Sequence, residues 1–411
     1  MRISTLLKRE PFGIILERTL KEFFQDFYGQ TYNIKWRRKQ FFTSTYKKGQ
    51  VWFCNPYINA IFVPQVNQEI LTPVIQEFSR SIKLWKTPFQ KTYVILAVNQ
   101  LTSRWLSTAF IEVNPPLNNA KKLLIIGGNN HIRLLDYSSN CTYVIHKSGF
   151  NKEFILNDIK VRMENTYLPT PRIKKISKNK SWYSESLILG TPINRLGNKA
   201  KAKNAVEAIT SSLFKLLRET SEEIDVEDYV AEIAQRIENQ IKEDRLLKVN
   251  TIEDLQQTLN NLLKIIKVLL QKGPKKIVTA QTHGDFHAAN ILMEQDHFWL
   301  IDWEYSSRRQ IAYDALVYSL ASRFPRDLNK RIGYALKGVS SDCEFLMSKW
   351  PMIEWQNKIQ RQIIIALFLL EELELKLKEN INSEFKSLGY GFKSFYHELK
   401  ISIQLLQKIT S

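Results

Sequence analysis

One stretch of the sequence, from Thr282 to Glu304, strongly limits what the chain can fold into. It reads THGDFHAANILMEQDHFWLIDWE, with Asp285 and Asn290 in a polar loop and Asp302 after an apolar run. Phosphoryl transfer needs one carboxylate that receives the proton of an attacking hydroxyl, and hard oxygen ligands that hold Mg²⁺ on the nucleotide phosphates. These three residues match that chemistry, with Asp285 as the base and the other two as metal ligands.

The spacing within this stretch predicts a β-hairpin. Residues 291–293 and 298–301 are short apolar runs, separated by the polar residues 294–297. Such a hairpin brings Asn290 and Asp302 to the same end, where both can reach one Mg²⁺. Asp285 would then mainly orient a substrate hydroxyl and take its proton late in a loose transition state.

The histidines of the loop allow more than one interpretation. His283, which belongs to the catalytic loop, is predicted to brace it through backbone hydrogen bonds rather than to act as a base. His287 fits either a loop brace or a substrate contact. A zinc site formed by both histidines and Asp285 is a minor alternative, because a spacing of four suits a helix, but Gly284 and the missing helical pattern argue against it.

A run of short strands precedes this stretch. Apolar segments at 123–126, 131–137 and 142–147 predict three strands, the first two joined by a turn that contains Gly127 and Gly128. The backbone of such a turn can approach phosphates, although Gly-Gly-Asn-Asn is also an ordinary hairpin turn.

A lysine and a glutamate follow in an informative order. Lys147 ends the third predicted strand, and Glu153 lies at the start of a helical pattern. An ion pair between them would direct the ammonium toward the α- and β-phosphates of a nucleotide. Taken alone, each residue is more typical of a solvated surface.

The second half of the chain has mainly helical periodicity. Asp225 is a candidate N-cap, and Glu371-Glu372-Leu373-Glu374 is expected to be an exposed helix face. The most apolar run, Ile363–Leu370, is far shorter than the about 20 residues that a membrane-spanning helix needs. Four helices are predicted, over residues 226–241, 255–270, 355–378 and 384–408.

The first 118 residues contain few recognisable patterns. Ala60–Val63 and Tyr93–Val98 are predicted strands, and the turn-rich Asn114–Asn119 is the predicted boundary. Lys35–Lys48 interleaves basic and aromatic residues and could bind nucleic acid or membrane headgroups, but a solvated helix flank or edge strand is the favoured interpretation.

Composition narrows the class of protein further. A chain of 411 residues predicts two or three domains, and a net charge of +18 favours phosphate-bearing partners such as nucleotides, nucleic acids or anionic membranes, or reflects a Lys-rich solvated surface. Cys54, Cys141 and Cys343 are widely spaced, which predicts a reducing, cytoplasmic compartment and no structural zinc site.

The residues HGDFHAAN at 283–290, followed by Ile301–Glu304, closely resemble the aminoglycoside phosphotransferase and choline kinase family. These are small-molecule kinases with a protein-kinase-like fold. The sequences LPTP at 168–171, GTP at 190–192 and Tyr313-Asp314 also fit the family pattern, the last as a helix anchor. The resemblance covers about residues 120 to 320.

The resemblance implies an α+β, two-lobed protein-kinase-like fold. Residues 119–190 would form a small antiparallel β N-lobe and residues 191–411 a mainly helical C-lobe that carries the catalytic and metal loops. Residues 1–118 match nothing in the family and are expected to be an N-terminal α/β extension of unassigned role.

The implied activity is ATP- and Mg²⁺-dependent phosphorylation of a hydroxyl on a small molecule, such as a sugar, an amino alcohol or a related acceptor. The roles carried over are those of Asp285 as base, Asn290 and Asp302 as metal ligands, and Lys147 with its partner Glu153 at the phosphates. The glycine turn departs from the family pattern because it lacks G-x-G-x-x-G.

Two other hypotheses remain open. The chain could be a catalytically silent kinase-fold binding protein that uses its basic N-terminal region, or it could associate with nucleic acid through Lys35–Lys48 and Arg172–Lys180. The charge of +18 disfavours a polycationic aminoglycoside as acceptor, because such a ligand needs an acidic pocket. The acidic cluster at 371–374 could still overrule this global charge, although an exposed helix face is the favoured interpretation.

Overall fold

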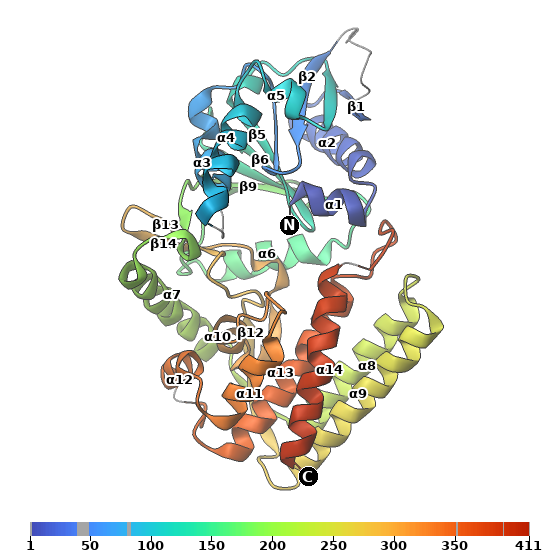
Figure 1. Ribbon diagram of the computed structural model, residues 1–411, viewed down its shortest axis with the longest axis vertical. Helices are drawn as coiled ribbons and strands as arrows, with labels where there is room; N and C mark the ends of the chain where they lie inside the picture. The colour runs from blue at the N-terminus through green and yellow to red at the C-terminus, as the bar shows by residue number, and fades with distance from the viewer. Residues whose placement is uncertain (1, 39–48, 80–83, 351, 389, 411) are drawn as a thin grey trace. The chain divides into compact units, whose positions relative to one another are not determined.

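The computed structural model describes residues 2–38, 49–79, 84–350, 352–388 and 390–410 (Figure 1). The chain divides into two compact units. Unit 1 comprises Met1–Leu156 and Pro171–Leu189, and unit 2 comprises Asn157–Thr170 and Gly190–Ser411. Most of the basic, aromatic segment Lys35–Lys48 lies outside the described residues, so the prediction made for it is not tested.

Unit 1 is built on a nine-stranded antiparallel sheet with the order β1-β4-β2-β3-β5-β6-β7-β9-β8. Its strands are β1 (Asn33–Arg38), β2 (Gln50–Asn55), β3 (Ala60–Phe62), β4 (Ala109–Asn114), β5 (Leu123–Gly127), β6 (His131–Asp136), β7 (Cys141–His146), β8 (Ile173–Ile176) and β9 (Trp182–Ser186). Its helices are α1 (Ile3–Arg9), α2 (Phe12–Tyr28), α3 (Gln68–Phe78), the 3₁₀ turn η1 (Leu84–Lys86), α4 (Thr87–Val98), α5 (Ser103–Leu106), the 3₁₀ turn η2 (Ala120–Lys122) and α6 (Glu153–Glu164), which belongs to unit 2 from Asn157 onward.

One sheet includes both the N-terminal residues and the predicted N-lobe strands. Strand β3 pairs with β5 through Ala60–Ile126 and Ile61–Ile125, so the sheet continues across the turn-rich segment at 114–119. Helix α2 packs on this sheet, where the ring of Phe23 lies 5.6 Å from that of Tyr143. The described part of the N-terminal 118 residues therefore shares a core with the strands that follow it.

The predicted strand at Tyr93–Val98 is wrong, because these residues form the end of helix α4. A short apolar run does not distinguish a strand from a buried helix segment. Pro88 in the first turn favours a helix start, and Val94, Ala97 and Val98 are buried at helical spacing.

Unit 2 is mainly helical. Its helices are the 3₁₀ turn η3 (Ile193–Arg195), α7 (Lys199–Glu219), α8 (Val226–Glu243), α9 (Val249–Leu270), the 3₁₀ turn η4 (Trp303–Tyr305), α10 (Tyr313–Ser319), α11 (Leu328–Lys337), α12 (Ser341–Ser348), α13 (Lys358–Lys378) and α14 (Tyr390–Thr410). The four helices predicted from periodicity are confirmed as α8, α9, α13 and α14. Asp225 is the N-cap of α8, as predicted, and accepts hydrogen bonds from the backbone N–H groups of Glu227 and Asp228.

Two small sheets accompany these helices. One contains β10 (Thr191–Pro192), β13 (Ile291–Glu294) and β14 (His297–Leu300), and the other contains β11 (Glu222–Asp225), β12 (Lys276–Thr282) and β15 (Ser307–Gln310). The predicted hairpin is confirmed, because β13 pairs with β14 from Ile291–Leu300 to Glu294–His297. The predicted α+β fold class, with an antiparallel sheet followed by a mainly helical part, is likewise confirmed. No helix within the described ranges has the length and apolar composition needed to cross a membrane.

Candidate functional site

The loop that follows β12 begins with a conformation that requires glycine. Gly284 has a φ of +84°, and a Cβ at this position would lie 2.1 Å from the backbone oxygen of Tyr305. A side chain would therefore collide with backbone that cannot easily move. This turn directs His283 inward and places Asp285 at the start of the polar loop.

Asp314 holds this turn from helix α10. Its carboxylate accepts hydrogen bonds from the backbone N–H groups of His283 (2.6 Å) and Gly284 (2.9 Å), and it is fully buried. Burial raises the pKa of Asp314. The predicted Tyr313-Asp314 anchor thus connects the beginning of α10 to the loop at 283–290.

His283 braces the loop, as the sequence predicts. Its Nδ1 accepts a hydrogen bond from the backbone N–H of Asp285 (3.1 Å), and its Nε2 donates to the backbone oxygen of Ile301 (3.0 Å). The ring is fully buried, and burial lowers the pKa of His283, which favours the neutral imidazole that these two bonds require. This histidine connects the loop before β13 to the segment after β14.

Asp285 is surrounded by hydrogen-bond donors. Its Oδ2 accepts from the Asn290 side-chain amide (2.8 Å) and lies 3.4 Å from His287 Nε2, while its Oδ1 lies 2.5 Å from Arg323 Nε. Burial acts to raise the pKa of Asp285, but Arg323 and His287 outweigh this effect and hold that pKa well below its usual range. Asp285 is therefore a fixed carboxylate that stays ionised at neutral pH.

Arg323 and Glu372 complete this arrangement, and sequence reasoning did not identify either of them. Arg323 Nη1 bonds to both carboxylate oxygens of Glu372 (2.9 and 2.8 Å), and Nη2 donates to the backbone oxygen of Gly284 (2.6 Å). The hydroxyl of Tyr313 donates to the same carboxylate. The expectation of an exposed acidic face at 371–374 is wrong for Glu371 and Glu372, which are buried inside unit 2.

The two predicted metal ligands lie at the same end of the hairpin. The backbone N–H of Ile301 donates to the backbone oxygen of Asn290 (3.0 Å), which places Asn290 next to the segment that continues into Asp302. Asp302 has a φ of +66°, a strained conformation that turns the chain sharply at this point.

The side-chain nitrogen of Asn290 donates to Asp285, so its amide oxygen is the atom that can face a cation. One amide oxygen and one carboxylate suit Mg²⁺, which takes its other ligands from phosphates and water. Across the described ranges, no group of three or more His, Cys, Asp and Glu side chains is arranged to hold a metal ion.

Unit 1 carries the residues predicted to bind the nucleotide. Lys147 follows β7 directly and is completely buried, with its ammonium 2.7 Å from Glu10 Oε1 and bonded to the backbone oxygen of Asn129 (2.8 Å). Arg9 contacts the other oxygen of Glu10 (2.7 Å) and the side-chain oxygen of Asn129 (2.6 Å). The segment between α1 and α2 is thus joined to both the lysine and the glycine turn.

Glu153 is the first residue of α6, which agrees with the helix start predicted from the sequence. The carboxylate that contacts the Lys147 ammonium at 2.7 Å nevertheless belongs to Glu10. Glu10 is 137 residues from Lys147 in sequence, and no motif marks it. A pair between Lys147 and Glu153 stays a prediction.

The glycine turn is tightly surrounded. The Asn59 side chain donates to the backbone oxygen of Gly127 (3.0 Å), and a Cβ at Gly127 would lie 2.6 Å from a side-chain carbon of Ile3. A Cβ at Gly128 would lie 2.6 Å from the backbone oxygen of His131. Both positions therefore require glycine, and the N-terminal residues pack directly against the turn.

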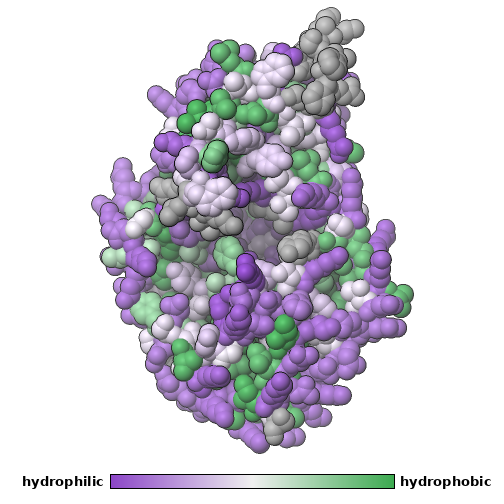
Figure 2. Space-filling model, viewed as in Figure 1, coloured by the Kyte–Doolittle hydropathy of each residue, from purple (hydrophilic) through white to green (hydrophobic). Residues whose placement is uncertain are grey.

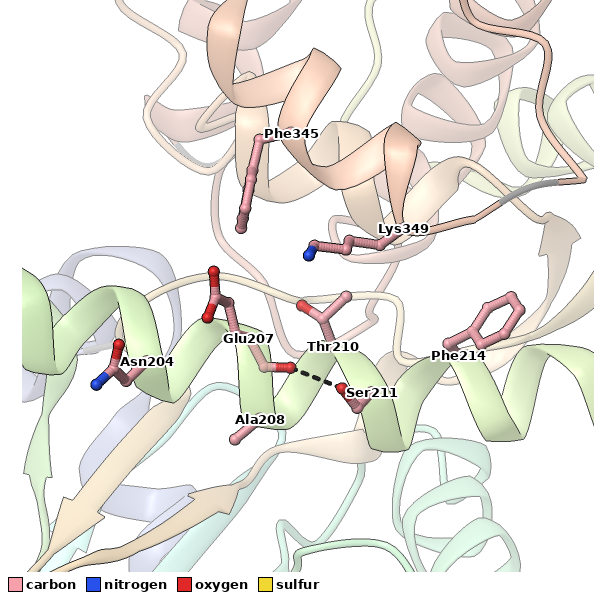
Figure 3. A pocket seen from close by; sticks show the side chains of 8 residues that line it. All are labelled: Asn204, Glu207, Ala208, Thr210, Ser211, Phe214, Phe345 and Lys349. Atoms are coloured by element: carbon pink, nitrogen blue, oxygen red, sulfur yellow. Dashed lines mark hydrogen bonds between the residues drawn. The ribbon is translucent and has the colours of Figure 1, made fainter.

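A separate pocket lies in unit 2 between α7 and α12 (Figure 3). Thr210 in its wall is buried, and within the described structure its hydroxyl has no hydrogen-bond partner. Polar and aromatic side chains from the two helices face each other across the pocket, and none of them comes from the loop at 283–290. The lining residues are Asn204, Glu207, Ala208, Thr210, Ser211, Phe214, Phe345 and Lys349.

Comparison with known proteins shows that the segment carrying the candidate site is similar to a kinase family. The family model described as choline/ethanolamine kinase matches residues 187–319, which include the loop at 283–290, the hairpin and helix α10. No curated protein sequence matches the chain. The family match confirms the resemblance predicted from the sequence and the assignment to small-molecule kinases.

Three solved structures show partial similarity to this chain. One is a thermostable mutant of aminoglycoside phosphotransferase APH(4)-Ia in a ternary complex with AMP-PNP and hygromycin B, with 12% identity, 69% of this chain and 93% of that chain covered, and a TM-score of 0.46. A second is choline kinase LicA from Streptococcus pneumoniae, with 13% identity, 70% and 90% covered, and a TM-score of 0.44. A third is a choline/ethanolamine kinase family protein from Mesorhizobium loti, with 13% identity, 78% and 99% covered, and a TM-score of 0.39.

Proposed function

We propose that this small-molecule kinase transfers the γ-phosphoryl group of ATP, in the presence of Mg²⁺, to a hydroxyl group of a sugar, an amino alcohol or a related acceptor. The observation that carries the proposal is the arrangement around Asp285. Arg323 holds the Asp285 carboxylate in its ionised form, and the Asn290 side chain bonds to the same carboxylate. The backbone of Asn290 in turn bonds to Ile301, the residue before Asp302.

Asp285 acts on the acceptor. Its carboxylate accepts a hydrogen bond from the acceptor hydroxyl and thereby aligns the oxygen for attack on the γ-phosphorus. The hydroxyl proton passes to Asp285 as the new O–P bond forms and the bond to ADP breaks. Because the pKa of Asp285 is held well below its usual range, orientation contributes more than basicity, and proton transfer comes late.

Different residues are proposed to bind the metal ion and the nucleotide. The amide oxygen of Asn290 and the carboxylate of Asp302 are the proposed Mg²⁺ ligands, and bound Mg²⁺ would neutralise charge on the β- and γ-phosphates. Gly127, Gly128 and Lys147 are the proposed nucleotide-binding residues of unit 1. Since the Lys147 ammonium bonds to Asn129 and Glu10, it would support the turn that contacts the phosphates.

The test is turnover on a panel of amino alcohols, sugars and aminoglycosides with ATP and Mg²⁺. The variant Asp285→Asn should lose roughly 10²- to 10⁴-fold in turnover while it still binds ATP and Mg²⁺ in calorimetry. Asp296→Asn, an exposed residue in the turn of the same hairpin, is the matched control and should behave as the unmodified protein. Failure of the unmodified protein to bind ATP with Mg²⁺ would refute the proposal, and binding without turnover would favour a silent binding protein.

A further inference from the structure

One stretch of unit 1 carries a concentration of exposed large apolar side chains. Six large apolar side chains between residues 85 and 105 are 42% to 83% exposed, whereas other exposed apolar side chains are spread along the chain. Single exposed apolar residues are normal on soluble proteins, but a contiguous group marks a contact surface. We call this group the aromatic patch, and its members are Trp85, Phe89, Ile95, Leu96, Leu101 and Trp105.

The patch is formed by three consecutive elements of the chain. It runs from η1 through α4 to α5, and Thr102 Oγ1 donates to the backbone oxygen of Leu96 (2.5 Å), which ties the α4–α5 connection to the end of α4. The opposite side of α4 is anchored by the buried Val94, Ala97 and Val98. Figure 2 shows near-white and green side chains gathered over α4 and α5 at the top of the view. Helix α4 is thus apolar on both its inner and its outer side.

The charged residues within this stretch of the sequence all have one sign. Lys86, Lys91 and Arg104 lie within it and are exposed, and the Lys86 ammonium lies 5.0 Å from the centre of the Trp85 ring. From residue 78 to residue 111 the sequence contains no Asp or Glu. A stretch that exposes Trp, Phe and cations and contains no acidic residue is complementary to an anionic, partly apolar partner.

We propose that the aromatic patch docks unit 1 on an anionic lipid membrane surface. Trp and Phe side chains partition into the boundary between headgroups and acyl chains, and Lys and Arg bind the phosphates of anionic headgroups. A second copy of the same patch fits poorly, because a symmetric contact would set Lys86 and Lys91 against the same cations. The attachment is peripheral, since no described helix can span a bilayer.

The test uses the full chain and vesicles of phosphatidylcholine, alone or mixed with phosphatidylglycerol. The protein should co-sediment with the mixed vesicles, bind phosphatidylcholine alone at least about tenfold more weakly, and lose affinity as salt rises. The double variants Trp85→Gln/Trp105→Gln and Lys86→Gln/Lys91→Gln should each weaken binding by about tenfold or more. All four positions are exposed, so folding should be retained, and thermal melting verifies this.

Two control variants test whether binding depends on the patch itself, rather than on any exposed apolar side chain or any exposed cation. Ile14→Gln removes an exposed apolar side chain elsewhere in unit 1, and Lys121→Gln/Lys122→Gln removes two exposed cations outside the patch. Both should bind as the unmodified protein does. The proposal is overturned if the full chain binds no anionic vesicles, if the controls weaken binding as much as the patch variants, or if the tryptophan variants change only the oligomeric state in gel filtration.

Discussion

At the scale of single residues, the ion pair between Arg323 and Asp285 has a consequence for pH dependence. Burial alone would raise the pKa of Asp285, and the nearby guanidinium is the main group that lowers it. In Arg323→Gln the pKa of Asp285 should therefore rise, and the acidic limb of the kcat/KM profile should move to higher pH. We also expect kcat to fall by about 10- to 100-fold, because the carboxylate loses the group that orients it.

Stability measurements give an independent check of this ion pair. A carboxylate with a lowered pKa in the folded state stabilises the protein above its ordinary pKa and loses that contribution as pH falls through the folded-state value. The stability deficit of Arg323→Gln should hence be largest near neutral pH and shrink below about pH 4. Arg326→Gln is the control, since that side chain is 95% exposed and should alter neither profile. An unchanged acidic limb in Arg323→Gln would contradict the assigned role.

At the scale of elements, helix α13 carries a buried carboxyl whose pKa is raised. Burial raises the pKa of Glu371 from its ordinary 4.5 to about 7, although the carboxyl accepts hydrogen bonds from the hydroxyl of Tyr229 and from Gln310. Because the folded-state pKa is the higher one, this group stabilises the fold fully below the ordinary value. The contribution is lost as pH rises through about 7.

Glu371→Gln should remove this pH dependence. The melting temperature of the unmodified protein should fall more steeply between about pH 5 and 8 than that of the variant, because only the unmodified protein must ionise a buried carboxyl in this range. Glu238→Gln on α8, an exposed position, should retain the steeper decline. Parallel curves for Glu371→Gln and the unmodified protein would show that Glu371 is already ionised throughout.

The elements also show which parts of the structure the sequence can predict. Helices α8 and α9 and the β13–β14 hairpin follow from local periodicity, caps and turns, which depend on neighbouring residues. The short run at 93–98 was assigned to the wrong element, because packing of Val94, Ala97 and Val98 into unit 1 decides its conformation.

The same distinction holds at the candidate site. Asp285, Asn290 and Asp302 lie within one stretch, so spacing alone brings them together. Their supporting partners come from much farther along the chain, and no motif marks Arg323. Arg323 is 38 residues from Asp285, and Glu372 is a further 49 residues away. Charged residues in an apolar helical run, such as Glu371 and Glu372 after Ile363–Leu370, were the available signal of a buried ionic site.

At the scale of the whole molecule, the N-terminal residues and the predicted kinase N-lobe are joined by several kinds of contact. Strand β3 continues the sheet at β5, and Trp182 of β9 donates to Asp26 of α2 (2.6 Å). The buried Lys147 ammonium lies 2.7 Å from the carboxylate of Glu10. Removal of one partner from a buried ion pair is strongly destabilising, because the remaining charge stays desolvated.

We therefore expect a chain that begins at residue 119 not to fold. It would expose the edge of β5, uncover Tyr143 and Trp182, and remove the Glu10 carboxylate from the buried Lys147 ammonium, so it should be insoluble or should melt without cooperativity. As the control, a protease site inserted at 117–118 allows the backbone to be cut after folding, and the two pieces should then stay together in gel filtration. A soluble 119–411 chain that unfolds cooperatively and binds ATP would instead show that residues 1–118 are a separable extension, as the turn-rich boundary in the sequence predicts.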